Sequence, residues 1–159
     1  MKMRETFFEE IRKGNTVAIT AELEKTPELL KATDSRGSSP LLLATYYGHL
    51  KLTELLIEKG AEIDKMDSSG NTALMGVCFK GYKEIAEVLV KAGANVNHVN
   101  SMGATSLIYA ATFNKIEIAR LLLDNGADID AKDGRGNTAL DSAKMQESPE
   151  MVQLLQDYQ

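Results

Sequence analysis

Glycine recurs at a fixed interval along this chain. Gly37, Gly70, Gly103 and Gly136 are each 33 residues apart, and an aspartate or asparagine lies three residues before each of them. A period that holds over four copies indicates a repeat protein, in which units too small to bury their own apolar face stack on their neighbours. The spacing therefore predicts a solenoid of four or five stacked units that share one continuous core.

Each period carries the signals of two helices. The Asp/Asn-x-x-Gly turn marks a tight loop, because the Asx side chain can bond its own backbone. A serine or threonine two residues after the glycine can cap a first helix, and apolar residues at helical spacing, as in 50–56, predict a second helix. The predicted unit is loop, helix, turn, helix, so the fold class is all-α. The capping residues are Ser39, Thr72, Thr105 and Thr138, and the glycines that end the second helices are Gly60, Gly93 and Gly126.

The two ends of the chain differ from the central units and predict capping repeats. Thr6-Phe7-Phe8-Glu9 predicts a capping box that opens the N-terminal helix, and Ser148-Pro149-Glu150 opens a last helix with polar outer residues. We therefore expect one complete, monomeric domain over residues 1–159. Its units are a degenerate N-terminal capping repeat at 1–33, full repeats at 34–66, 67–99 and 100–132, and a C-terminal capping repeat at 133–159.

The unit resembles that of the ankyrin repeat family, which reads D-x-x-G-x-T-P-L-H-x-A-A-x-x-G-H, then an apolar helix, then L-L-x-x-G-A-D-x-N. Residues 34–44 with Gly48-His49 carry the first part, and the match covers nearly the whole chain. The resemblance implies an ankyrin-repeat solenoid of antiparallel helix pairs with short hairpin-like loops. The family's histidine after T-P-L, which joins neighbouring repeats, is absent, and apolar packing is expected instead. That position holds Leu42, Met75, Ile108 and Asp141.

Composition argues against several other classes of protein. The formal net charge of −5 disfavours nucleic-acid binding, which needs clustered Lys and Arg. The single cysteine, Cys78, forms no internal disulfide and has no zinc-site spacing around it, so no metal or cofactor is predicted. No signal peptide is visible, and the apolar runs are far shorter than the roughly 20 residues of a membrane span. We expect a cytoplasmic protein.

Candidate binding residues follow from the resemblance, because ankyrin repeats contact partners through the inner face of the first helix and the loop tips. Aromatic residues gather late in three successive first helices, and the 33-residue register makes Tyr46 equivalent to Phe79 and Tyr47 equivalent to Phe113. We expect these four rings to line up as an aromatic strip, with Tyr109 in the core. The alternative is that each ring fills space between repeats. The candidates on the first helices are Tyr46, Tyr47, Phe79, Lys80 and Phe113.

The loops give a second candidate surface, which is mildly basic. Such charge can steer an acidic partner on an acidic protein, although solvated turns often carry Lys and Arg for no special reason. The candidates on the loops are Arg36, Lys65, Met66, His98, Met102, Lys132 and Arg135.

The function predicted from these residues is a non-catalytic protein-protein interaction module that binds another protein through its concave helix-one face and loop tips. No pair of side chains has the arrangement of an active site. His49 matches the family's Gly-His turn, and Cys78 occupies a position that the family fills with alanine. Two alternatives stay open: a redox-responsive or enzymatic role for Cys78, and a structural, self-assembling repeat protein.

Overall fold

The computed structural model describes residues 2–159, which form ten α-helices and one short 3₁₀ helix and contain no strand. The all-α prediction is confirmed, and the ten helices form pairs consistent with about five repeats. The elements are α1 (Lys2–Lys13), α2 (Thr16–Lys25), η1 (Pro27–Lys31), α3 (Pro40–Tyr46), α4 (Leu50–Glu58), α5 (Ala73–Lys80), α6 (Lys83–Lys91), α7 (Ser106–Thr112), α8 (Ile116–Asp124), α9 (Ala139–Met145) and α10 (Pro149–Asp157).

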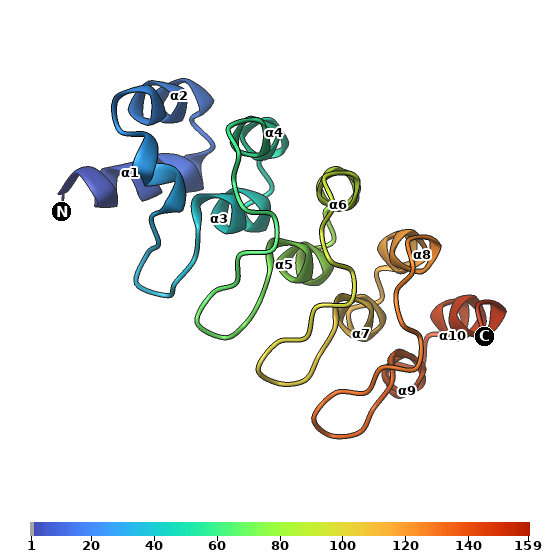
Figure 1. Ribbon diagram of the computed structural model, residues 1–159. Helices are drawn as coiled ribbons and strands as arrows, with labels where there is room; N and C mark the ends of the chain where they lie inside the picture. The colour runs from blue at the N-terminus through green and yellow to red at the C-terminus, as the bar shows by residue number, and fades with distance from the viewer. Residues whose placement is uncertain (1) are drawn as a thin grey trace.

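The helices lie in two rows with the loops on one side (Figure 1). The odd-numbered helices, α1 to α9, form the first-helix row, and the even-numbered helices, α2 to α10, form the second-helix row. Each helix packs against its own partner and against the equivalent helix of the next pair, as α5 packs on α6 and on α7. The contacts are therefore almost all between neighbouring repeats, as expected of a solenoid.

The helix boundaries follow from local side-chain chemistry. The four predicted caps each accept a hydrogen bond from the backbone N–H three residues later, which satisfies one of the exposed donors at the helix start. Thr138 and Asp141 complete a reciprocal capping box. The second helices end where predicted, at Gly60, Gly93 and Gly126, which all have positive φ.

The predicted capping box at the N-terminus is wrong. Helix α1 already begins at Lys2, so Thr6 lies inside the helix and caps nothing. Lys2, Met3, Arg4 and Glu5 are good helix formers and extend the helix one turn upstream, while Phe7 and Phe8 are buried in the hydrophobic core. The aromatic pair was therefore a core signal rather than a helix start.

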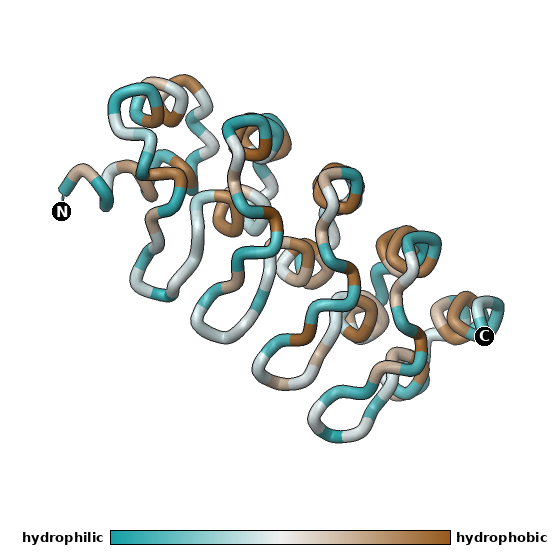
Figure 2. Tube along the Cα trace, in the orientation of Figure 1, coloured by the Kyte–Doolittle hydropathy of each residue, from teal (hydrophilic) through white to brown (hydrophobic). Residues whose placement is uncertain are grey.

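The core runs unbroken between the two rows. In the first helices Leu41, Leu74 and Leu107 are buried and Leu140 is half-buried. The leucines at one shared position of the second helices, Leu56, Leu89, Leu122 and Leu155, are fully buried. Leu42, Met75 and Ile108 are also buried, which confirms that apolar packing occupies the position of the family's histidine. Figure 2 shows the same division, with hydrophobic residues mostly on the helices and hydrophilic ones mostly on the loops.

The loops are joined to one another by a repeated backbone contact. The N–H of Ser68 donates to the carbonyl of Arg36 at 3.1 Å, and Ser101 donates to Ser69 in the same way at 3.1 Å. The N–H of Gly134 donates to Met102 at 3.0 Å. Within each loop, the Oδ1 atom of Asp34, Asp67, Asn100 or Asp133 accepts two backbone N–H groups, as the Asx turn predicts.

Candidate functional site

A groove follows the angle between the loops and the first-helix row. It consists of three adjoining hollows of about 520, 310 and 350 Å³, which we call the first, second and third hollow. Tyr46 lines both the first and the second, and Tyr109 lines both the second and the third, so the hollows are continuous across the repeats. Loop residues form one wall of each hollow and first-helix residues form the other.

Three of the four rings of the aromatic strip are exposed at this groove. Tyr47, Phe79 and Phe113 are 46%, 45% and 38% exposed, and Tyr46 is half-buried. The rings of Phe79 and Phe113 meet edge to face with their centroids 4.6 Å apart, and Tyr46 and Tyr47 meet in the same manner at 5.8 Å. Edge-to-face contacts of this kind are favourable and fix the rings against each other.

The register of these contacts differs from the one predicted. We expected equivalent residues, 33 positions apart, to line up, but the observed contacts join residues 34 positions apart. Phe79 meets Phe113, and the same contact one repeat earlier brings the ammonium group of Lys80 to 4.9 Å from the ring centroid of Tyr46. Lys80 is thus held by a cation–π interaction, which sequence reasoning did not foresee.

Tyr109 combines the two roles that were considered for the aromatic residues. It is half-buried and packs against the core, and it also lines the second and third hollows. Its hydroxyl accepts a hydrogen bond of 2.8 Å from Nδ2 of Asn100, and its ring stacks on Phe113 at 6.3 Å. The prediction of a core position is therefore right for only part of the side chain.

The predicted loop residues fall into two groups. Two of them are half-buried and hold neighbouring repeats together: Nζ of Lys65 donates to the carbonyl of Lys31 at 3.2 Å, and Nε2 of His98 is hydrogen-bonded with the carbonyl of Gly70 at 2.9 Å. The structure gives these two side chains contacts inside the chain that the sequence pattern did not indicate. The remaining candidates, Arg36, Met66, Met102, Lys132 and Arg135, are exposed.

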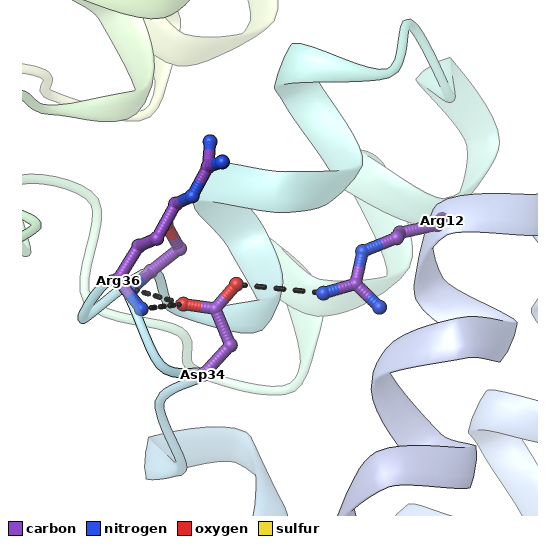
Figure 3. Close-up of polar contacts among 4 residues, drawn as sticks. Arg12, Asp34 and Arg36 are labelled. Carbon is purple, nitrogen blue, oxygen red and sulfur yellow. Dashed lines mark hydrogen bonds and ion pairs between the residues drawn. The ribbon is translucent and has the colours of Figure 1, made fainter.

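One ion pair at the first hollow was missed by sequence reasoning (Figure 3). The guanidinium of Arg12, from α1, lies 3.5 Å from Oδ2 of Asp34, while Oδ1 of the same aspartate accepts the N–H of Arg36. The guanidinium of Arg36 extends away from Asp34. Arg12 belongs to the degenerate first repeat, where no glycine of the 33-residue series sets the register, so its position could not be inferred.

Cys78, metal binding and membrane-spanning length are further features of residues 2–159 that bear on function. The side chain of Cys78 is fully buried, and burial raises the pKa of its thiol to about 12, with a smaller opposing effect of the Ser106 hydroxyl. Such a thiol is protonated at neutral pH, which favours its interpretation as a packing residue. Over residues 2–159, no three His, Cys, Asp or Glu side chains are grouped to hold a metal ion, and no helix has the length and apolarity to cross a membrane.

The structure defines a helical-repeat protein. It has helix pairs of 33-residue period, Asx loops joined to their neighbours and a groove beneath the loops. The family model of ankyrin repeats in three copies matches residues 11–100, 41–133 and 92–159. The chain therefore belongs to the ankyrin repeat family. Ankyrin repeats are generally protein-interaction modules and are typically non-catalytic.

One curated relative is the ankyrin repeat and SAM domain-containing protein 6 of Mus musculus. It is 34% identical to this chain over 64 residues, which is 40% of the chain and 7% of the mouse protein. The similarity thus covers only a small part of that relative.

Proposed function

We propose that this protein binds a protein partner in the groove and catalyses no reaction. The observation that carries the proposal is the exposure of three aromatic rings, from three successive repeats, along one groove. Large aromatic side chains left in solvent on a folded domain usually mark an interaction surface, and Tyr and Phe often anchor interfaces. Tyr47, Phe79 and Phe113 are the three rings.

The second hollow is suited to a side chain of the partner. Its floor is formed by Leu42 and Met75, and its sides by the rings of Phe79, Tyr109 and Phe113. A volume of about 310 Å³ is at the small end of ligand pockets, which commonly span roughly 300 to 1,000 Å³. One or two bulky apolar side chains would fill it and would bury the exposed ring faces.

The rings are held in place before any partner arrives. The contact of Phe79 with Phe113 restrains both side chains, and the hydroxyl of Tyr109 is fixed by Asn100. Less conformational freedom is then lost when a partner binds, which favours affinity for a given buried area. The exposed loop residues Met102 and Arg135 border the third hollow and can add contacts at one end of the groove.

A triple variant tests the proposal. In affinity capture from the lysate of the source organism, the native chain should retain a protein that the Tyr47→Ala/Phe79→Ala/Phe113→Ala variant loses, because the variant lacks the three exposed rings. A matched control is Val17→Ala, which removes an apolar side chain of α2 that is 82% exposed and outside the groove. Both variants should first be shown to unfold cooperatively on heating.

Two results would contradict the proposed binding in the groove. If the triple variant and the native chain retain the same proteins in equal amounts, the aromatic strip has no part in binding. A loss of binding with Val17→Ala as well would place the interface on a different face of the solenoid.

A further inference from the structure

We propose that the groove selects an acidic linear segment of its partner, one that carries Asp or Glu residues beside a bulky apolar side chain. The inference rests on the proposed function, because it takes for granted that the groove is the binding surface. It adds the chemical class of the bound segment.

Cations without a carboxylate partner lie along the groove. Arg36 lines the first hollow, Arg135 lines the third, and Lys80 lies over Tyr46, which lines the first and second. Within residues 2–159, none of these three side chains has a carboxylate oxygen within 4.0 Å. Lys83 of α6, outside the groove, has carboxylate partners in both Glu87 and Glu117. Each hollow therefore has one cation beside it that is free to meet an anion.

The carboxylates of the groove are engaged in their own loops. Asp34, Asp67 and Asp133 line the hollows, and Oδ1 of each accepts two backbone N–H groups. Asp34 is further neutralised by Arg12 at 3.5 Å. These hydrogen bonds hold the aspartates in half-buried positions at the base of the loops, whereas the three cations are exposed. A bound segment consequently meets positive charge first.

This local charge is opposite to that of the chain as a whole, whose formal net charge is −5. Beyond the first hollow, Glu5 and Glu9 of α1 line a further hollow. The three exposed cations thus extend from Arg36 at the first hollow to Arg135 at the third. Complementary charge on a partner would both orient the segment and speed its encounter with the groove.

Lys80 links the charge to the apolar hollow. Its ammonium group is 4.9 Å from the centroid of Tyr46, at the boundary of the first and second hollows. An apolar side chain inserted into the second hollow, beside Phe79 and Phe113, would place the neighbouring residues of the same segment close to this cation. The ring contact also limits the motion of the lysine, so less entropy is lost when it meets a carboxylate. The position of Lys80 beside the second hollow therefore suits a bound segment in which an acidic residue is next to an apolar one.

The test uses a displayed library of random peptides selected on the full chain. The enriched sequences should carry an excess of Asp and Glu together with an aromatic or large aliphatic residue, and their affinity should fall as the salt concentration rises. Enriched peptides are then synthesised with a fluorophore and titrated by fluorescence polarisation. Phe79→Ala should raise Kd by about tenfold or more, since it removes an anchor. Lys80→Met should raise Kd by about threefold, as expected for one exposed ion pair.

Lys51→Met is the matched control for the charge, because Lys51 is an exposed lysine of α4 that lies outside the groove. It should leave Kd unchanged. Enriched peptides that are neutral or basic, yet lose affinity with Phe79→Ala, would overturn the inference and leave the proposed function standing. Peptides whose Kd is the same for Phe79→Ala and the native chain would contradict both. A library that yields no enriched sequence would overturn the recognition of a linear segment.

Discussion

A single thiol shows how far burial changes the chemistry of one residue in this chain. Cys78 lies on the inner side of α5 and has no exposed surface. Its pKa is raised to about 12 from an ordinary value of 9.0, mainly because the thiolate would lose its hydration on burial. The side chain therefore contributes to packing as a small apolar group.

The raised pKa of Cys78 predicts a pH dependence of stability. Above about pH 9 the unfolded chain releases the thiol proton while the folded chain keeps it, so ionisation favours unfolding. The contribution of this group is complete below pH 9.0 and is lost as pH rises toward 12, by at most about 1.4 kcal/mol per pH unit. Urea denaturation at a series of pH values should show the free energy of unfolding falling more steeply for the native chain than for Cys78→Ala. Parallel curves for the two proteins would contradict the expectation.

Residues whose partners are close in sequence could be predicted, and residues with distant partners could not. The cap at Ser39 bonds the N–H of Leu42, three residues away, so residue type and position suffice to find it. His98 instead bonds the carbonyl of Gly70, which is 28 residues earlier, and Lys65 reaches Lys31, which is 34 residues earlier. Their roles depend on how the repeats stack, and the sequence of one repeat does not contain that information.

At the scale of elements, the loops behave as a second layer of the solenoid. Their tips are joined by the backbone contacts of Ser68, Ser101 and Gly134 with the preceding loop. Close approach of two backbones leaves little room for a side chain. The cost of replacing a repeat glycine therefore depends on which atoms lie next to it. Gly103 and Gly136 occupy the same turn position with φ of 75° and 85°, yet they differ in their neighbours.

Substitution of these two glycines by alanine should separate turn strain from loop contact. A Cβ at Gly103 would lie 2.7 Å from the backbone nitrogen of Gly134, whereas a Cβ at Gly136 would have nothing within 4 Å. In both variants the free energy of unfolding should fall by about 1 to 2 kcal/mol, because alanine is strained in the left-handed conformation. Gly103→Ala should lose about 1 kcal/mol more, because the bond from Gly134 to Met102 must stretch. Urea midpoints at constant m-value measure the difference, and equal midpoints would mean that the loop contact adds no stability.

The order and type of the elements could be predicted, but the contacts between them could not. The first helices begin at the predicted caps, which recur four times, and the second helices end at the predicted glycines, which recur three times. The start of α1 was misplaced because Thr6 has the chemistry of a cap but lies one turn inside the helix. The groove was predicted only as a list of residues. The 34-residue offset that pairs Phe79 with Phe113 is a contact between repeats, which the 33-residue register alone does not give.

For the whole molecule, stability depends on the position of a repeat in the stack. Leu89 and Leu155 occupy the same register, and both are fully buried. Leu89 lies in α6, which packs against α4 and α8, while Leu155 lies in α10, which packs against α8 and α9. A core substitution in α6 therefore disturbs repeats on both sides, whereas a core substitution in α10 disturbs only one end of the stack.

Hydrogen exchange of the native state should reveal this difference. Leu89→Ala and Leu155→Ala should each cost about 2 to 5 kcal/mol, the range for large-to-small changes in a core. In the first variant, amide exchange should quicken in α4, α6 and α8 together. In the second, it should quicken in α9 and α10 and leave α4 and α6 as protected as in the native chain. Uniform acceleration along the chain in both variants would show that the solenoid unfolds as a single unit.

The contact that joins the loops also bears on how such a chain can change in length. Each bond connects the residue just after one loop's aspartate or asparagine to a carbonyl at a fixed position in the loop before it, in the same geometry each time. A tandem duplication of residues 67–99 would therefore supply the new copy with a donor for the loop on one side and an acceptor for the loop on the other. Addition of a whole repeat needs no compensating substitution at the junction, so a single duplication in the gene can change the number of repeats.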